Sequence, residues 1–196
     1  MKNRIRLDLY NQDWYSRGRS NAVVLLWWLV QGTLFRFSLH NMYGWRRFLL
    51  RMFGARIGRG VQVRATAKFT YPWKVSIGDY SWIGDNVEFY SLDRIEVGEH
   101  CVVSQHCYLC TGSHDMTDEA FGLLIRPIVI RDGAWIASDV FVYPGVTVGV
   151  MGVVAARSTV VKDVPANQVF AGTPAKFVKE RFQEKALQEK ARLHMI

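Results

Sequence analysis

A six-residue hydrophobic repeat constrains the fold of this 196-residue chain more than any other feature. Bulky apolar residues recur at every sixth position, and the residue four places after each is usually small or β-branched. This period matches neither an α-helix nor a single strand, and it is typical of a parallel β-helix in which three units close one triangular coil. One coil cannot bury its own apolar face, so we expect the coils to stack. The repeated positions are Ile57, Val63, Phe69, Ile77, Ile83, Phe89, Val97, Val103, Leu109, Ile130, Ile136, Val142, Val148, Val154 and Val160.

Breaks in the repeat predict where loops leave this scaffold. The step lengthens to eight residues after Phe69 and again after Phe89, and it lengthens to twenty-one after Leu109. Each break follows the third unit of a coil, so the extra residues should leave the prism at the same corner. We expect a protruding loop over residues 110–129, and loops on a rigid scaffold are where binding and catalysis usually occur.

The chain divides into three regions around the repeat. Residues 1–56 form a basic, partly helical segment, and residues 57–165 form the β-helix. Residues 166–196 form a C-terminal extension, in which the tail from Phe177 to about Leu193 has the single apolar stripe of a helix. The predicted fold is an all-β solenoid, a parallel β-helix with an N-terminal helical segment and a C-terminal helix.

The positive charge is concentrated near the N-terminus. Residues 1–59 carry eleven Lys or Arg and two Asp, a net +9, and the remainder carries fourteen against fifteen, a net −1. Two helices are predicted there, from Ala22 to Phe35 after a Ser20 cap and from Trp45 to Phe53. Either these helices cover an end or flank of the β-helix, or their aromatic, basic surface makes weak peripheral contact with an anionic membrane. The basic side chains beside the apolar face of the second helix are Arg46, Arg47 and Arg51.

The three cysteines form neither a disulfide framework nor a metal site. Cys101 and Cys107 fall on small inward positions and are expected to stack in the core, while Cys110 begins the long loop. No metal-ligand spacing joins the cysteines to the five histidines, and no nucleic-acid-binding module is recognised. No secretory signal is evident and the longest apolar run is too short to span a bilayer, so we expect a cytoplasmic protein.

The repeat resembles the left-handed β-helix of the hexapeptide-repeat acyltransferases, and further motifs resemble their colanic-acid-biosynthesis O-acetyltransferase branch. Together they cover nearly the whole chain. The resemblance implies an acetyl-CoA-dependent O-acetyltransferase that acts on a sugar hydroxyl in exopolysaccharide or other surface-polysaccharide biosynthesis, assembled as a homotrimer. The motifs are Leu7-Asp8-Leu9, Trp14-Tyr15, Trp27-Trp28, Phe53-Gly54-Ala55-Arg56-Ile57-Gly58, Tyr71-Pro72-Trp73-Lys74 and Cys110-Thr111-Gly112-Ser113-His114-Asp115.

His114 is the candidate catalytic base. A neutral imidazole is suited to removing a proton from a hydroxyl near neutral pH, and the resemblance gives His114 this role. An acceptor must orient its other ring nitrogen, and Asp115, Asp93 and a backbone carbonyl all remain open. No Ser/His/Asp nucleophile motif is present, so direct transfer is favoured over an acyl-enzyme.

The resemblance also implies an acetyl-CoA site between adjacent subunits. Ser138 and Ala156 would border the pantetheine arm, and Trp135 belongs to the same signature. Lys162, and also Lys179, would meet the nucleotide phosphates as point charges; ordinary solvated lysines are the alternative.

Two positions depart from the family pattern. Arg157 stands where glycine is usual, so that corner is strained or reshaped, and Val161 replaces a common threonine. On the edge expected to carry the long loop, Tyr71, Trp73 and Tyr90 are candidates for a sugar-stacking surface, with core packing as the alternative.

Two other functions remain open. One is an acetyltransferase for a small non-carbohydrate hydroxyl or amine, and the other is a non-catalytic β-helix assembly module. A pure scaffold needs neither the His114 loop nor the cofactor signature, so their joint presence favours an enzyme.

Overall fold

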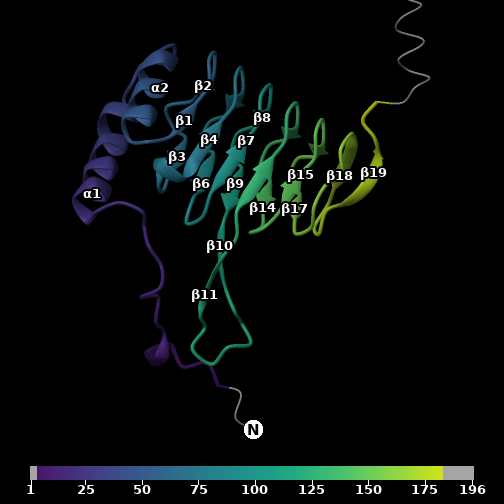
Figure 1. Cartoon of the computed structure of the whole chain (residues 1–196). Helices are drawn as coiled ribbons and strands as arrows, with labels where there is room; N and C mark the ends of the chain where they lie inside the picture. The colour runs from purple at the N-terminus through teal and green to yellow at the C-terminus, as the bar shows by residue number, and fades with distance from the viewer. Residues whose placement is uncertain (1–3, 183–196) are drawn as a thin grey trace, which may run out of the picture.

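Three short parallel sheets build the body of the molecule, and each supplies one face of a triangular prism (Figure 1). The computed structural model describes residues 4–182. Successive strands fall on faces A, B and C in turn, and each pairs with the equivalent strand of the next coil, as Ile57 pairs with Ile77. The result is the predicted left-handed parallel β-helix.

The strands are two to five residues long and follow the repeat. Face A contains β1 (Arg56–Ile57), β4 (Val75–Ile77), β7 (Ile95–Val97), β12 (Ile128–Ile130) and β15 (Thr147–Val148). Face B contains β2 (Gln62–Val63), β5 (Trp82–Ile83), β8 (Val102–Val103), β13 (Trp135–Ile136), β16 (Val153–Val154) and β18 (Gln168–Ala171), with β19 (Lys176–Glu180) at its edge. Face C contains β3 (Lys68–Phe69), β6 (Glu88–Tyr90), β9 (Tyr108–Cys110), β14 (Phe141–Val142) and β17 (Thr159–Val160).

The repeated apolar residues fill the interior of the prism. Each of them is at most 7% exposed, so the predicted core is confirmed. Cys101 and Cys107 stack inside as expected, and their thiols donate to the carbonyls of Arg131 and Ala137 at 3.1 and 2.9 Å. Burial raises the pKa of the Cys107 thiol to about 11, so it remains a neutral core group.

The insertions share one edge of the prism, where the chain passes from face C to face A; we call this the C–A edge. A short 3₁₀ turn, Pro72–Lys74, lies between β3 and β4. The long excursion lies between β9 and β12 and forms an antiparallel hairpin of β10 (Gly112–His114) and β11 (Leu123–Ile125). Figure 1 shows this hairpin projecting away from the coils, so the predicted protruding loop is confirmed and carries strands of its own.

Helices close the N-terminal end of the solenoid. α1 (Asn21–Val30) continues into a π-helical turn (Gln31–Phe35), and α2 (Tyr43–Met52) follows before Gly54 ends it at φ +89°. Trp27 and Phe35 are fully buried against the first coil, together with Leu49 and Leu50 of α2. The predicted helices therefore exist, although the Ser20 side chain makes no capping hydrogen bond.

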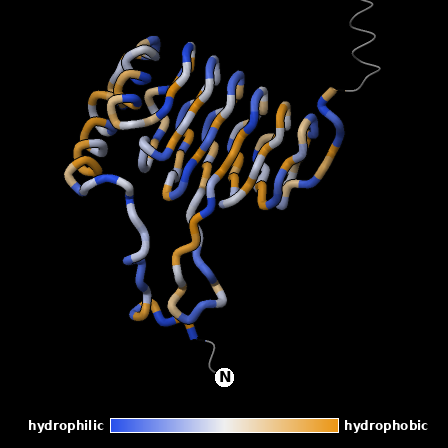
Figure 2. Tube along the Cα trace, in the orientation of Figure 1, coloured by the Kyte–Doolittle hydropathy of each residue, from blue (hydrophilic) through white to orange (hydrophobic). Residues whose placement is uncertain are grey.

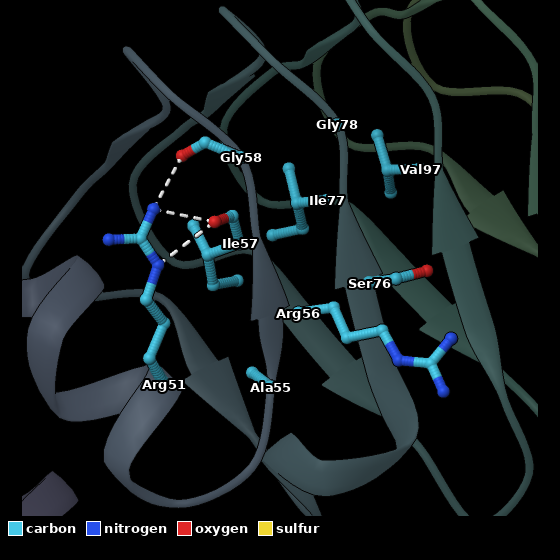
Figure 3. A pocket seen from close by; sticks show the side chains of 9 residues that line it. All are labelled: Arg51, Ala55, Arg56, Ile57, Gly58, Ser76, Ile77, Gly78 and Val97. Atoms are coloured by element: carbon cyan, nitrogen blue, oxygen red, sulfur yellow. Dashed lines mark hydrogen bonds between the residues drawn. The ribbon is translucent and has the colours of Figure 1, made fainter.

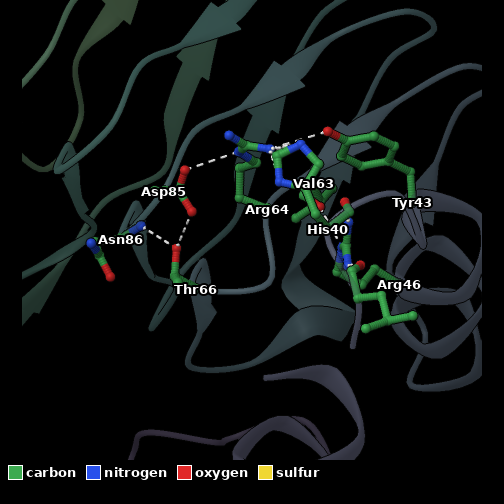
Figure 4. Close-up of polar contacts among 9 residues, drawn as sticks. His40, Tyr43, Arg46, Val63, Arg64, Thr66, Asp85 and Asn86 are labelled. Atoms are coloured by element: carbon green, nitrogen blue, oxygen red, sulfur yellow. Dashed lines mark hydrogen bonds and ion pairs between the residues drawn. The ribbon is translucent and has the colours of Figure 1, made fainter. Parts of the chain in front are cut away.

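Arginines of α2 donate hydrogen bonds to the backbone carbonyls at the open end of the first coil. Backbone N–H groups of each coil donate to carbonyls of the next, as Gly58 does to Ile77, so the first coil's own carbonyls lack a preceding coil. Side chains replace that missing coil. Arg51 donates to the Ile57 and Gly58 carbonyls (Figure 3), Arg47 to Val61, Arg46 to Val63 (Figure 4), and Trp27 Nε1 to Phe69.

These contacts correct the sequence-based interpretation of the α2 arginines. Arg46 is fully buried and also donates to Ser38 and to the Leu39 and His40 carbonyls, so it is neither solvated nor available to lipid. The neighbouring Arg64 extends this cap by pairing with Asp85 at 2.9 Å (Figure 4). Buried carbonyls require hydrogen-bond donors, and the arginines supply them. The sequence pattern did not reveal that the first coil has carbonyls in need of such donors.

The C-terminal end is closed by a strand instead of the predicted helix. Residues Lys176–Glu180 form β19, which pairs antiparallel with β18, so the prediction of a helix starting at Phe177 is wrong. The edge of β18 offers free backbone groups, and pairing with β19 satisfies them. The rest of the predicted helix, residues 183–193, lies outside the described residues.

Candidate active site

The hairpin places His114 on an exposed arm of the C–A edge. His114 ends β10 opposite Leu123 of β11, and its ring stacks on Phe121 with centroids 4.5 Å apart and planes at 6°. Its Nδ1 lies 2.9 Å from the Phe121 carbonyl oxygen. A carbonyl only accepts, so Nδ1 carries the proton and, in the neutral ring, the lone pair is left on Nε2. His114 is thereby oriented with Nε2 as the ring nitrogen that can accept a proton.

The two carboxylates considered as orienting partners make other contacts. Asp115 accepts from the backbone N–H and hydroxyl of Thr117, and these bonds lower the pKa of the Asp115 carboxyl. Asp93 accepts from the backbone N–H of the next residue, Arg94. Of the three acceptors left open by the sequence, the structure places a backbone carbonyl beside His114.

The N-terminal segment runs back along the hairpin, which the sequence did not indicate. Figure 1 shows it leaving α1 toward the hairpin tip, where the Arg6 N–H donates to the Glu119 carbonyl at 2.8 Å. Tyr10 lies beside His114, with ring centroids 5.8 Å apart. Phe121 and Tyr10 thus flank His114, and neither belongs to a pattern in the sequence that would have singled it out.

The three candidate acceptor aromatics pack in one cluster, and Tyr90 alone continues into a row of rings. Tyr71 is buried, and Trp73 stacks on it while donating from Nε1 to the Arg17 carbonyl at 2.6 Å. Both pack beneath the N-terminal segment. Tyr90 packs against the same cluster and also begins a row of rings from face C, beside Gly112 at the base of the hairpin. The row continues through Tyr108, Phe141 and Tyr143, with successive centroids 6.0, 5.3 and 5.5 Å apart.

The candidate cofactor residues are spread over the prism. Ser138 and Ala156 line a shallow hollow of about 360 Å³ on the edge between faces B and C, which we call the B–C edge. Trp135 lies on face B with its Nε1 donating to Ser104 Oγ at 3.0 Å. Lys162 is exposed on the C–A edge, and Lys179 is exposed on β19. One chain therefore does not gather these residues around His114.

Arg157, in the glycine position, adopts the left-handed conformation at φ +58°. It belongs to a column of corners on the B–C edge that share positive φ, with Asn86, His106 and Asp139 on the preceding coils. Its guanidinium pairs with Asp139 at 3.5 Å in the same hollow. The corner keeps the regular geometry, so the predicted departure changes the chemistry of the hollow more than its backbone.

Among residues 4–182, no three His, Cys, Asp or Glu side chains are grouped so that they could hold a metal ion. The groups that the C–A edge presents near the hairpin are the oriented imidazole of His114, the ring of Tyr10 and the backbone groups of the hairpin.

Comparison with known proteins gives matching relatives over most of the chain, although no family model matches. A protein named as a candidate colanic acid biosynthesis acetyltransferase, WcaF of Escherichia coli K12, is 52% identical over 167 residues, covering 85% of this chain and 92% of the relative.

Solved structures share the fold. A hexapeptide-repeat acetyltransferase from Vibrio cholerae, complexed with acetyl coenzyme A, aligns with a TM-score of 0.76 and 28% identity over 83% of this chain and 88% of that one. A galactoside acetyltransferase in complex with coenzyme A aligns with a TM-score of 0.77 and 26% identity over 84% of each chain. The chain belongs to the hexapeptide-repeat acetyltransferase family, in the branch of the colanic acid biosynthesis acetyltransferases.

Proposed function

We propose that this protein is a cytoplasmic acetyl-CoA:sugar O-acetyltransferase of surface-polysaccharide biosynthesis. The observation that carries the proposal is the His114 ring, held by the Phe121 carbonyl with Nε2 free on an exposed hairpin. The relatives named above supply the reaction class, because they are acetyltransferases described with acetyl coenzyme A, coenzyme A or a polysaccharide pathway.

The proposed reaction is direct transfer. Nε2 of His114 accepts the proton of a sugar hydroxyl while that oxygen attacks the thioester carbonyl of the donor. A C–O bond forms, the C–S bond breaks, and the thiolate of coenzyme A leaves with the proton from Nε2. The Phe121 carbonyl stabilises the imidazolium that exists between these two proton transfers, because it accepts from Nδ1–H throughout.

Acetyl-CoA would lie along the B–C edge. The hollow at Ser138 and Ala156 offers backbone groups to the pantetheine amides, and Arg157 adds a cationic side chain beside them. Trp135 borders the same coil on face B. Lys162 and Lys179 are exposed ammonium groups suited to the nucleotide phosphates.

The protein is proposed to be a homotrimer with three shared sites. His114 is on the C–A edge and the hollow is on the B–C edge, so the whole of face C separates them within one chain. In the proposed trimer the B–C edge of one copy would lie against the C–A edge of its neighbour, in a closed cyclic arrangement. The acceptor would approach over Tyr90 and Tyr10, because Tyr10 lies beside His114 and both tyrosines pack against the same apolar cluster.

The test is release of free coenzyme A from acetyl-CoA, measured with the purified protein and a panel of sugars, nucleotide sugars and lipid-linked oligosaccharides. We expect one class of sugar acceptor to stimulate release and to carry the acetyl ester afterwards. Stimulation only by small non-carbohydrate alcohols or amines would move the function to the alternative acetyltransferase. No acetyl-CoA binding and no release would identify a non-catalytic scaffold.

A further inference from the structure

We propose that the outer face of the N-terminal helices is a docking surface for an anionic lipid bilayer. The proposal is independent of the acetyl transfer argued above. It concerns α1 and the turn after it, at the end of the solenoid away from β19 (Figure 1). No helix among the described residues is long and apolar enough to cross a membrane, so contact would be with the bilayer surface.

Only one side of this helical segment is covered by protein. Val24, Trp27 and Phe35 face the solenoid and are buried, at the spacing of one helical stripe. Six apolar side chains between residues 25 and 39 are 52–81% exposed, and Trp28 is 49% exposed, whereas Val23 and Val30 are half-buried. Figure 2 shows the resulting hydrophobic colouring along α1 at the outer margin of the molecule. These exposed residues, which we call the lipid face, are Leu25, Leu26, Leu29, Leu34, Phe37 and Leu39.

The size of the lipid face calls for a partner. A helix that is apolar all round is normally buried in protein or in a membrane, and large contiguous apolar patches on a soluble protein mark interaction sites. The face continues into a hollow of about 460 Å³ lined by Leu34, Phe37, Leu39, Met42 and Trp45. An uneven apolar surface of this kind suits acyl chains, which conform to it.

The charges around the lipid face identify the partner. No Asp or Glu occurs between residues 14 and 78, and residues 21–35 carry no charge at all. Exposed Arg17 and Arg19 precede α1, and exposed Arg36 follows the turn within the face. An apolar strip bordered by arginines is the arrangement that binds an anionic membrane surface, since the arginines meet the headgroups while the leucines enter the acyl boundary.

A second copy of the chain fits this surface less well. A two-fold contact places the same patch of both copies together, so Arg36 of one copy would face the same basic rim of the other. No carboxylate of residues 14–78 is available to neutralise it. Phosphate headgroups neutralise the same rim directly.

The experiment is co-sedimentation of the full chain with vesicles of phosphatidylcholine alone and with vesicles that also contain phosphatidylglycerol. We expect binding to the anionic vesicles at low salt and little binding to the neutral ones. The double variant Leu25→Ser with Leu29→Ser should lose binding by at least about tenfold. Arg36→Gln should lose about fivefold at low salt and differ little from wild type at high salt.

A matched control distinguishes vesicle binding through the lipid face from vesicle binding through any exposed apolar side chain. Phe177 and Val178 are similarly exposed, at 52% and 56%, but lie on β19 at the other end of the solenoid. Phe177→Ser with Val178→Ser should leave vesicle binding unchanged. Acetyl transfer to a soluble acceptor should be equal in wild type and in the leucine variant, so failure of either proposal is seen separately.

Three outcomes would overturn the proposal. The first is a wild-type protein that ignores anionic vesicles at low salt, and the second is equal loss of binding in the β19 control. The third is a leucine variant that changes the oligomer mass in light scattering without changing vesicle binding, because that result assigns the face to a second copy.

Discussion

The C–A and B–C edges of the prism are built from the same coils but carry different chemistry. On the B–C edge every corner has the same length, and positive φ recurs at Asn86, His106, Asp139 and Arg157. That regularity gives successive coils the same corner, and three of these corners together line the hollow at Ser138 and Ala156. The C–A edge tolerates insertions, and the longest of them carries His114. A repeating edge is suited to an extended ligand, whereas an interrupted edge positions a single reactive side chain.

The largest expected effect comes from the C–A edge. We expect His114→Asn to lower kcat by roughly 10²–10⁴-fold, the usual contribution of a positioned general base, while acetyl-CoA binding stays within about twofold. His100→Asn is the control, because His100 is an exposed histidine on the edge between faces A and B. Steady-state kinetics and donor titration measure both. Wild-type turnover in the His114 variant would remove the imidazole from the mechanism.

The next prediction tests whether the acetyl-transfer site is built from one chain or from two neighbouring chains. Ser138→Trp should block the B–C hollow and abolish activity by itself. When this variant and His114→Asn are refolded together at random, about one quarter of the sites in a cyclic trimer combine two intact edges. We therefore expect about one quarter of wild-type activity from two inactive proteins. A mixture as inactive as its components, or a monomeric wild type in light scattering, would place both edges of the site in one chain.

A smaller effect is expected at Lys162. Removing a charge-assisted contact to phosphate costs about 1.5–3 kcal/mol, so Lys162→Ala should raise KM for acetyl-CoA roughly tenfold or more and leave kcat nearly unchanged. Lys176→Ala serves as the matched exposed lysine on β19. Equal KM values for acetyl-CoA in the two variants would show that Lys162 is a solvated lysine that does not contact the nucleotide phosphates.

The smallest effect is expected at Asp115, although it is the neighbour of His114. Its carboxylate holds the Thr117 turn, and an amide oxygen can accept the same bonds, so Asp115→Asn should change kcat by less than about threefold. The folded-state pKa of Asp115 is lowered, so its bonds weaken only as pH falls below the ordinary aspartate range of about 3.9. The activity profile near neutral pH should therefore match wild type. A loss comparable with that of His114→Asn would make Asp115 the orienting partner.

The solenoid itself could be read from the sequence because its determinants are local. Each coil needs only apolar residues six apart, and the positions from Ile57 to Val160 satisfy that rule without reference to distant contacts. The breaks in the repeat predicted the C–A edge for the same reason. His114 followed from the loop that contains it.

The remaining features depend on contacts between distant segments. Tyr10 reaches His114 only because the N-terminal segment returns along the hairpin, and Phe121 orients the ring through a backbone carbonyl that any residue would provide. β19 replaces the predicted helix because the free edge of β18 outweighs the helical pattern of the tail. None of these three contacts leaves a periodic pattern in the sequence.

The arginine contacts at the first coil have a consequence for how this end of the solenoid can meet another chain. Arg46, Arg47 and Arg51 hold main-chain carbonyls, which every coil presents alike whatever its side chains. These arginine contacts make no demand on the side chains of the coil they cover, unlike the apolar contacts of Trp27 and Phe35 with the same coil. Because the arginines occupy these acceptors, this end of the solenoid offers fewer free backbone groups with which another chain could pair.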